Sequence, residues 1–309
     1  MLRLSFFLIS AALILTASTC ERPANVEIEG PEPELVVISN FSDQRVLQVQ
    51  VSKSIDALTG SAIEYVENAN IELFEEDEFI EQLQLASLQN TTPFYTTYEL
   101  KPKVGVRYTI QVDVPGFRTV KAQSSIPPQI NIERLQLSDL YQRDIAENKK
   151  QFDYKITLTF LDPPRAKNLY HLKFFQQVKE YETFEDKVHI TDIHYKEITF
   201  NPLTDSNNQL SYFNGGILFE DGLLDGQAIS YTFPLQISIR PDREMLGKVI
   251  AELRAVSEEY YLYHNSLSRQ RGNPGVPFTE PVTIYDNIEN GQGIFAGYSA
   301  SQDSLTVIQ

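Results

Sequence analysis

Apolar and polar residues alternate with a period of two along much of this chain. Every second residue is apolar in three long segments, 152–160, 229–239 and 249–255. This pattern is typical of strands in an antiparallel sheet that bury one face and expose the other. Before residue 127 there are shorter segments of the same kind, at 34–39, 46–51, 70–74, 79–85, 94–100 and 106–112. The pattern therefore predicts a mainly β protein.

Two consecutive prolines divide this pattern into two predicted domains. Pro127 and Pro128 make a stiff, extended junction, because each proline fixes its own φ and restricts the residue before it. We expect an N-terminal Ig-like antiparallel sandwich over 34–126 and a second antiparallel β-rich domain over 127–309. The run 105–117 resembles the prealbumin-like or carboxypeptidase-regulatory-like sandwich. The charged segment 138–150 is predicted to be a short helix or an ordered loop.

One C-terminal helix is predicted over residues 257–271. Ser257 is a suitable N-cap, and Glu258 and Glu259 follow in the first turn, where the helix dipole favours acidic residues. Gly272 and Pro274 end the predicted helix.

A glycine-rich loop from Tyr285 to Tyr298 follows this helix and allows two interpretations. In the structural one, the loop forms a turn that lets Ile288, Ile294 and Phe295 close the core of the second domain. In the functional one, the loop is an exposed docking surface. We favour the structural interpretation, because loop glycines usually serve backbone geometry. The candidate residues under both interpretations are Asn287, Gly291, Gly293, Phe295 and Gly297.

The N-terminus has the layout of a secretory signal peptide. Arg3 precedes an apolar run over 4–17 that is too short to span a membrane. The chain's one cysteine, Cys20, follows directly and resembles the lipid attachment site of a bacterial lipoprotein. We therefore predict a signal peptide over 1–19 and a lipidated Cys20 on a flexible tether over 20–33. The alternative is an ordinary leader in which the cysteine falls at this place by chance.

Charge and motifs exclude several classes of function. The formal net charge of −16 disfavours nucleic acid as a partner, because phosphate contacts need clustered lysine and arginine. His189 and His194 lie on opposite faces of any single strand, and no HExxH pattern accompanies them. Asp221 and Asp225 each precede a glycine, which indicates turns rather than a calcium site. With no GxSxG motif either, we predict no catalytic residue, cofactor or metal, and a protein that is not an enzyme.

Four segments together are similar to one known family. In chain order they are ELVVISNF at 34–41, ILFEDGLLDG at 217–226, SEEYYLYHNSL at 257–267 and PFTEPVTIYDNIENGQGIFAGY at 277–298. They resemble a Bacteroidota-type family of outer-membrane lipoproteins that is labelled only as a domain of unknown function. The resemblance implies anchorage in the outer membrane, on a side that it does not specify, and a TonB-dependent receptor as partner. It implies no catalytic residues.

We therefore expect a non-enzymatic accessory or ligand-binding partner of such a receptor in nutrient uptake. One alternative is a structural or assembly component of the cell envelope, which would have a stable partner but no soluble ligand. The other is a lipid-anchored hydrolase, which would show turnover.

Overall fold

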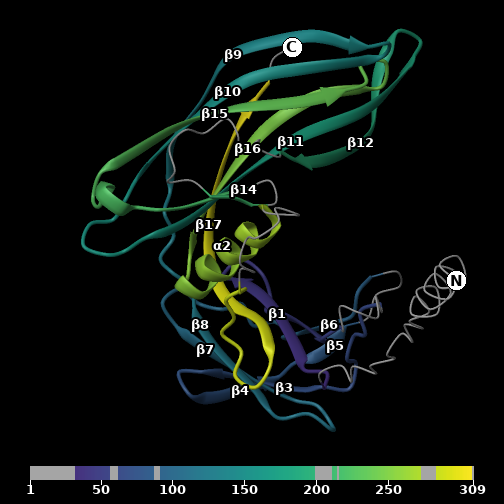
Figure 1. The fold of residues 1–309 in the computed structure, drawn as a ribbon. Coiled ribbons are helices and arrows are strands. Elements are labelled where there is room, and N and C mark those ends of the chain that lie inside the picture. Colours follow the sequence, from purple (N-terminus) through teal and green to yellow (C-terminus); the bar gives the residue numbers. More distant parts are fainter. Residues whose placement is uncertain are drawn as a thin grey trace, which may run out of the picture. The chain divides into compact units, whose positions relative to one another are not determined.

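The fold is built almost entirely from strands, as the alternating pattern predicts (Figure 1). The computed structural model describes residues 32–55, 62–86, 91–198, 211–213, 216–272 and 283–307. The predicted signal peptide, Cys20 and the tether up to residue 31 lie outside the described residues. All described residues except Glu32 belong to one compact unit, Pro33–Gln309.

The described residues form seventeen strands, one short 3-10 helix and one α-helix. The first eight strands are β1 Leu35–Ser42, β2 Gln48–Lys53, β3 Asn70–Glu75, β4 Glu78–Gln82, β5 Gln84–Ala86, β6 Phe94–Thr96, β7 Arg107–Asp113 and β8 Val120–Ser125. The elements after Pro127 and Pro128 are β9 Ile132–Ala146, β10 Lys149–Leu161, β11 Leu169–Phe184, β12 Lys187–Glu197, β13 Ser211–Phe213, β14 Gly216–Glu220, η2 Gly222–Leu224, β15 Ala228–Ile239, β16 Glu244–Val256, α2 Glu258–Gly272 and β17 Gln292–Thr306.

The first eight strands surround one apolar core. β3, β4, β7 and β8 form a four-stranded sheet, while β1, β2, β5 and β6 belong to the end of a ten-stranded sheet. Leu35 and Val49 from the large sheet pack with Ile71 and Ile110 from the small one. These residues alternate with more exposed ones along their strands, so the period-two pattern places them in a shared core.

A second apolar core forms between β9, β10 and β15 on one side and β11, β14 and β16 on the other. Phe152 and Ile156 of β10, Phe174 of β11 and Leu253 of β16 are all completely or almost completely buried in it. The long alternating segments of the sequence therefore form the strands of this core, as predicted. The two cores divide near Ile126, which belongs to the first, and Ile130, which belongs to the second.

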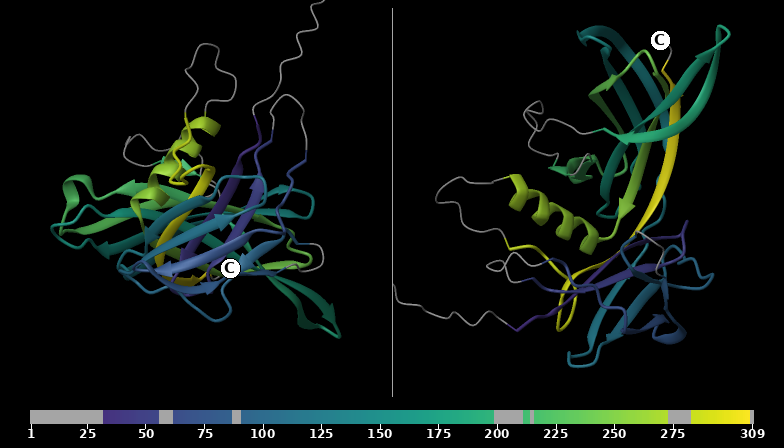
Figure 2. Two further views of the ribbon diagram at one scale, coloured as in Figure 1. Left: turned by 90° about the horizontal axis from the view of Figure 1, so that it is seen from below. Right: turned by 90° about the vertical axis from the view of Figure 1, so that its right-hand side faces the viewer.

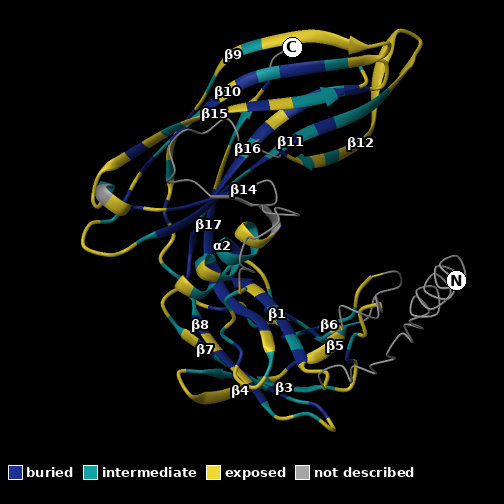
Figure 3. Ribbon diagram, viewed as in Figure 1, coloured by how far each residue is buried: buried dark blue, intermediate teal, exposed yellow. Residues whose placement is uncertain are grey.

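The prediction of a helix or loop over 138–150 is wrong. This segment forms the end of β9 and the start of β10, with a turn at Asn148, whose φ is +54°. From Ser138 to Ala146, every residue except Leu140 is exposed. This end of β9 is accordingly coloured mostly as exposed in Figure 3. With no buried face, nothing requires apolar residues at every second position, so the alternation that identifies a strand is missing.

β17 takes part in both cores and adds one parallel pair of strands to the antiparallel arrangement that the sequence predicts. Its first half pairs parallel with β1, from Val36 opposite Gln292 to Ser42 opposite Tyr298, and its second half pairs antiparallel with β16. This is the one parallel pair of strands in the described part of the chain. A parallel neighbour needs a long connection, and here nearly the whole chain lies between the two strands.

The predicted C-terminal helix is present as α2, which starts directly after β16 (Figure 2). The backbone N–H of Tyr260 donates to the Ser257 hydroxyl over 3.3 Å, as expected for an N-cap. Tyr260 and Val256 pack with Leu218 of β14 and Ile294 of β17 in a small third apolar cluster. The helix therefore covers the sheet where β14 and β17 pass beneath it.

Candidate functional site

The predicted tail residues lie just before and within the first half of β17, and their glycines lie against the backbone of β1 and β8. Gly293 has a φ of +118°, and a Cβ atom built there would lie 2.0 Å from the backbone oxygen of Val37. A Cβ atom at Gly297 would lie 2.4 Å from the backbone oxygen of Ser125, and one at Gly291 would lie 2.8 Å from that of Leu35. These three glycines therefore permit a close approach of backbones that any side chain would prevent.

Asn287 fixes the path of this segment by pairing with Phe295. The Phe295 N–H donates to Asn287 Oδ1 over 3.0 Å, and Asn287 Nδ2 donates to the Phe295 carbonyl over 2.8 Å. The expected burial of Ile288, Ile294 and Phe295 is observed, but not in the second core. Ile288 and Phe295 belong to the first core and Ile294 to the cluster under α2, because β17 pairs with β1 here.

A buried polar network, which no motif in the sequence reveals, lies under α2. Arg254 Nη1 donates to the Tyr260 hydroxyl over 3.0 Å, and the Arg254 guanidinium also pairs with Glu252. The Tyr260 hydroxyl lies 2.9 Å from His171 Nδ1. Because Arg254 can only donate, the Tyr260 hydroxyl oxygen accepts this bond, and the hydroxyl links Arg254 to His171.

Burial keeps the two histidines of this region neutral. It lowers the pKa of His171 well below its ordinary value, and the positive charge of Arg254 lowers it further. The same two causes lower the pKa of His264, whose ring lies 4.2 Å from that of Tyr260, to about 3. Burial also raises the pKa of Tyr260. The protonation states of His171, His264 and Tyr260 therefore do not change near neutral pH. The network stabilises the packing of α2 on the sheet.

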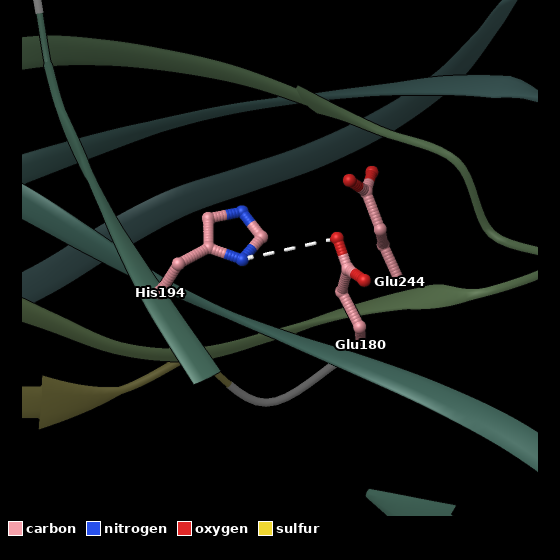
Figure 4. Close-up of side chains that lie close together, drawn as sticks. All are labelled: Glu180, His194 and Glu244. Carbon is pink, nitrogen blue, oxygen red and sulfur yellow. Dashed lines mark ion pairs between the residues drawn. The ribbon is translucent and has the colours of Figure 1, made fainter. Parts of the chain in front are cut away.

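A second polar cluster, which the sequence did not reveal, lies at the end of the second core. Glu180 of β11 is directly opposite Glu244 of β16, and His194 of β12 is the diagonal neighbour of Glu180, two residues beyond its partner Asp192. Diagonal and opposite neighbours share one face of a sheet, so the three side chains converge (Figure 4). One ligand atom from each lies within 4.8 Å of the other two.

The three members of this cluster differ in their surroundings. The Glu244 side chain is 4% exposed, and its carboxylate accepts from the Arg240 N–H over 2.7 Å and lies 3.4 Å from Lys196 Nζ. Burial would raise the pKa of Glu244, but the Arg240 hydrogen bond and the charge of Lys196 outweigh it and leave this pKa below its ordinary value. Glu180 and His194 are 41% and 32% exposed, and His194 Nδ1 lies 4.0 Å from Glu180 Oε1. The cluster is therefore accessible from one side.

A third polar cluster contains the two aspartates of the predicted turns. Asp162, Asp221 and Asp225 converge beside a pocket of about 520 Å³. Their carboxylates already accept protein hydrogen bonds: Asp162 from the Gly226 N–H, Asp221 from the Asn168 N–H and Asp225 from the Arg165 N–H. These bonds hold the turns around η2 in place, in agreement with the interpretation of Asp221 and Asp225 as turn residues.

The comparisons with known proteins identify the family but no function. In the described residues, no helix has both the length and the apolar character needed to cross a membrane. No curated protein matches the chain. The sequence model of a family described as "Domain of unknown function (DUF4249)" matches residues 21–304, which is most of the chain. This chain therefore belongs to the DUF4249 family, a family of unknown function.

Proposed function

We propose that this protein is a lipoprotein of the outer membrane that acts, without catalysis of its own, as a partner of a TonB-dependent receptor in nutrient uptake. The anchor is supported by the sequence, in which Cys20 directly follows the apolar run over 4–17. The receptor is suggested by the resemblance of four segments to outer-membrane lipoproteins. Replacement of Cys20 by serine is expected to release the chain from membranes, and mass spectrometry of the mature protein is expected to find an acylated Cys20.

One structural observation carries the proposal of a protein partner. β12 pairs with β11 alone in the described part of the chain, so one of its edges faces away from the sheet. Large apolar side chains on β12 and at the adjoining end of β11 are 45–68% exposed; these are Phe184, Val188, Ile190, Ile193 and Tyr195. An edge strand that exposes apolar side chains is suited to binding another protein, because it offers both unpaired backbone groups and apolar surface.

Affinity isolation of the intact lipoprotein from detergent-solubilised envelopes tests this function. We expect mass spectrometry to identify a TonB-dependent receptor among the enriched proteins. Enrichment of a different envelope protein would favour a structural or assembly role instead. Substrate turnover by the purified protein would contradict the non-enzymatic part of the proposal.

A further inference from the structure

Ion pairs within the protein do not fully explain why Glu180, His194 and Glu244 lie so close together. Glu180 and Glu244 are opposite one another on adjacent strands, an arrangement in which two negative charges repel. Lys196 and Arg240 both pair with Glu244. Glu180 has a single possible ion-pair partner in the described part of the chain, the partly exposed His194 at 4.0 Å, which lies equally far from Asp192. The cluster therefore brings two carboxylates and an imidazole close together (Figure 4).

We propose that Glu180, His194 and Glu244 bind one Zn²⁺ ion. Zinc takes imidazole nitrogen and carboxylate oxygen as ligands at about 2.0–2.2 Å. In a tetrahedral site with such bonds, the ligand atoms are about 3.3 Å apart. The present separations of up to 4.8 Å must therefore close by about 1.5 Å at most. Glu180 and His194 are partly exposed, so rotation of their side chains can supply this movement.

The donor set also favours zinc over the hard cations. Calcium and magnesium prefer sites made only of oxygen ligands, whereas an imidazole beside two carboxylates suits a borderline metal. Three protein ligands leave the fourth tetrahedral position of zinc for a water molecule. A divalent ion would also offset the repulsion between Glu180 and Glu244.

The cations that now pair with Glu244 can make room for the metal. The side chain of Lys196 is 35% exposed and that of Arg240 is 47% exposed, so both can turn toward solvent. Their contacts with Glu244 Oε1 are long, at 3.4 and 3.3 Å. The ion would join β12, β11 and β16, three neighbouring strands, and so fasten the β11–β12 hairpin at the end of the second core.

Calorimetric titration of the intact lipoprotein in detergent, after removal of metals with EDTA, tests the site with Zn²⁺ and Ca²⁺ as probes. We expect one Zn²⁺ per chain and no Ca²⁺. His194→Asn and Glu180→Gln should each weaken zinc binding about ten-fold or more, since loss of a direct ligand costs at least as much as loss of its supporting contacts. His189→Asn on the same strand is the matched control and should bind zinc as the wild type does.

A second pair of variants separates the site from a general effect of charge. Lys196→Ala removes the cation beside Glu244 and is expected to tighten zinc binding. Lys187→Ala makes the same change in charge at the far end of β12 and is expected to leave it unchanged. The proposal is overturned if the wild type binds no zinc at a 1:1 ratio, if His194→Asn and Glu180→Gln bind like His189→Asn, or if both lysine variants behave alike.

Discussion

Substitution of Gly293 by alanine is expected to lower the free energy of unfolding much more than a glycine-to-alanine change at an unconstrained position. Its φ of +118° is strained for any L-residue, which costs about 1–3 kcal/mol. The new Cβ atom would also lie 2.0 Å from the Val37 carbonyl oxygen, so β17 must move away from β1. Weakening two or three ladder hydrogen bonds costs about 1 kcal/mol each. We expect a total loss of about 3–6 kcal/mol.

Two other glycines separate these effects. Gly116 has a φ of +88° with open space around it, so Gly116→Ala reports backbone strain alone, about 1–2 kcal/mol. Gly297 shows no positive φ, but its Cβ atom would lie 2.4 Å from the Ser125 carbonyl oxygen. Gly297→Ala therefore reports the close contact alone, about 1–3 kcal/mol.

Urea unfolding at 25 °C and thermal melting measure these differences. For a chain of this size, the Gly293→Ala loss corresponds to a decrease in Tm of about 6–24 °C. If Gly293→Ala unfolds at the same urea concentration as Gly116→Ala, the backbone contact with Val37 has no energetic consequence and the reasoning is refuted. Unchanged stability with lost receptor binding would instead support the docking interpretation of this loop.

Three further predictions concern α2 and the groups beneath it. Tyr260→Phe removes the acceptor of Arg254 Nη1, while the guanidinium keeps its pair with Glu252, and is expected to cost about 1.5–3 kcal/mol in urea unfolding. Tyr261→Phe, which loses no side-chain hydrogen bond found among the described residues, should cost much less. His264 has a folded pKa below its unfolded pKa, so its contribution to stability is present above about pH 6.5 and is lost as the pH falls toward 3. His264→Gln should therefore reduce the pH dependence of the unfolding free energy between pH 6 and 4 by up to about 1.4 kcal/mol per pH unit, and an unchanged slope would contradict the shifted pKa. Ser257→Ala should cost about 1 kcal/mol and lower the helical circular dichroism signal before global unfolding, and equal helix stability in both proteins would argue against the cap.

The sequence predicted those elements whose burial is regular. β10, β15 and β16 each have an alternating apolar face in the second core, and α2 has its cap and acidic first turn in sequence. The strands in the segment 138–150 were not predicted, because both faces of this segment are mostly exposed. The parallel pairing of β1 with β17 was not predicted, because no local pattern specifies which distant strand becomes a neighbour.

The candidate zinc ligands could not be found by spacing. Glu180 and His194 are brought together by a hairpin, and a register shift between Glu180 and Tyr181 changes the alignment of the strands. Glu244 comes from a third strand, so the three residues form no local motif. In contrast, the glycines at 291, 293 and 297 could be selected from the sequence, because glycines in a loop indicate constraints on the backbone. The sequence did not show which strand they approach.

The amount of TonB-dependent receptor that co-isolates with each chain tests the central claim most directly. The comparison uses the wild-type chain, Ile193→Asp on β12 and Ile63→Asp, a matched control at a similarly exposed apolar residue. The account predicts a receptor-to-chain ratio near one for the wild type and for Ile63→Asp, and a loss of about ten-fold or more for Ile193→Asp, because a buried charge at the centre of an interface is costly. A receptor signal at background in all three proteins, or the same ratio in all three, would contradict the account.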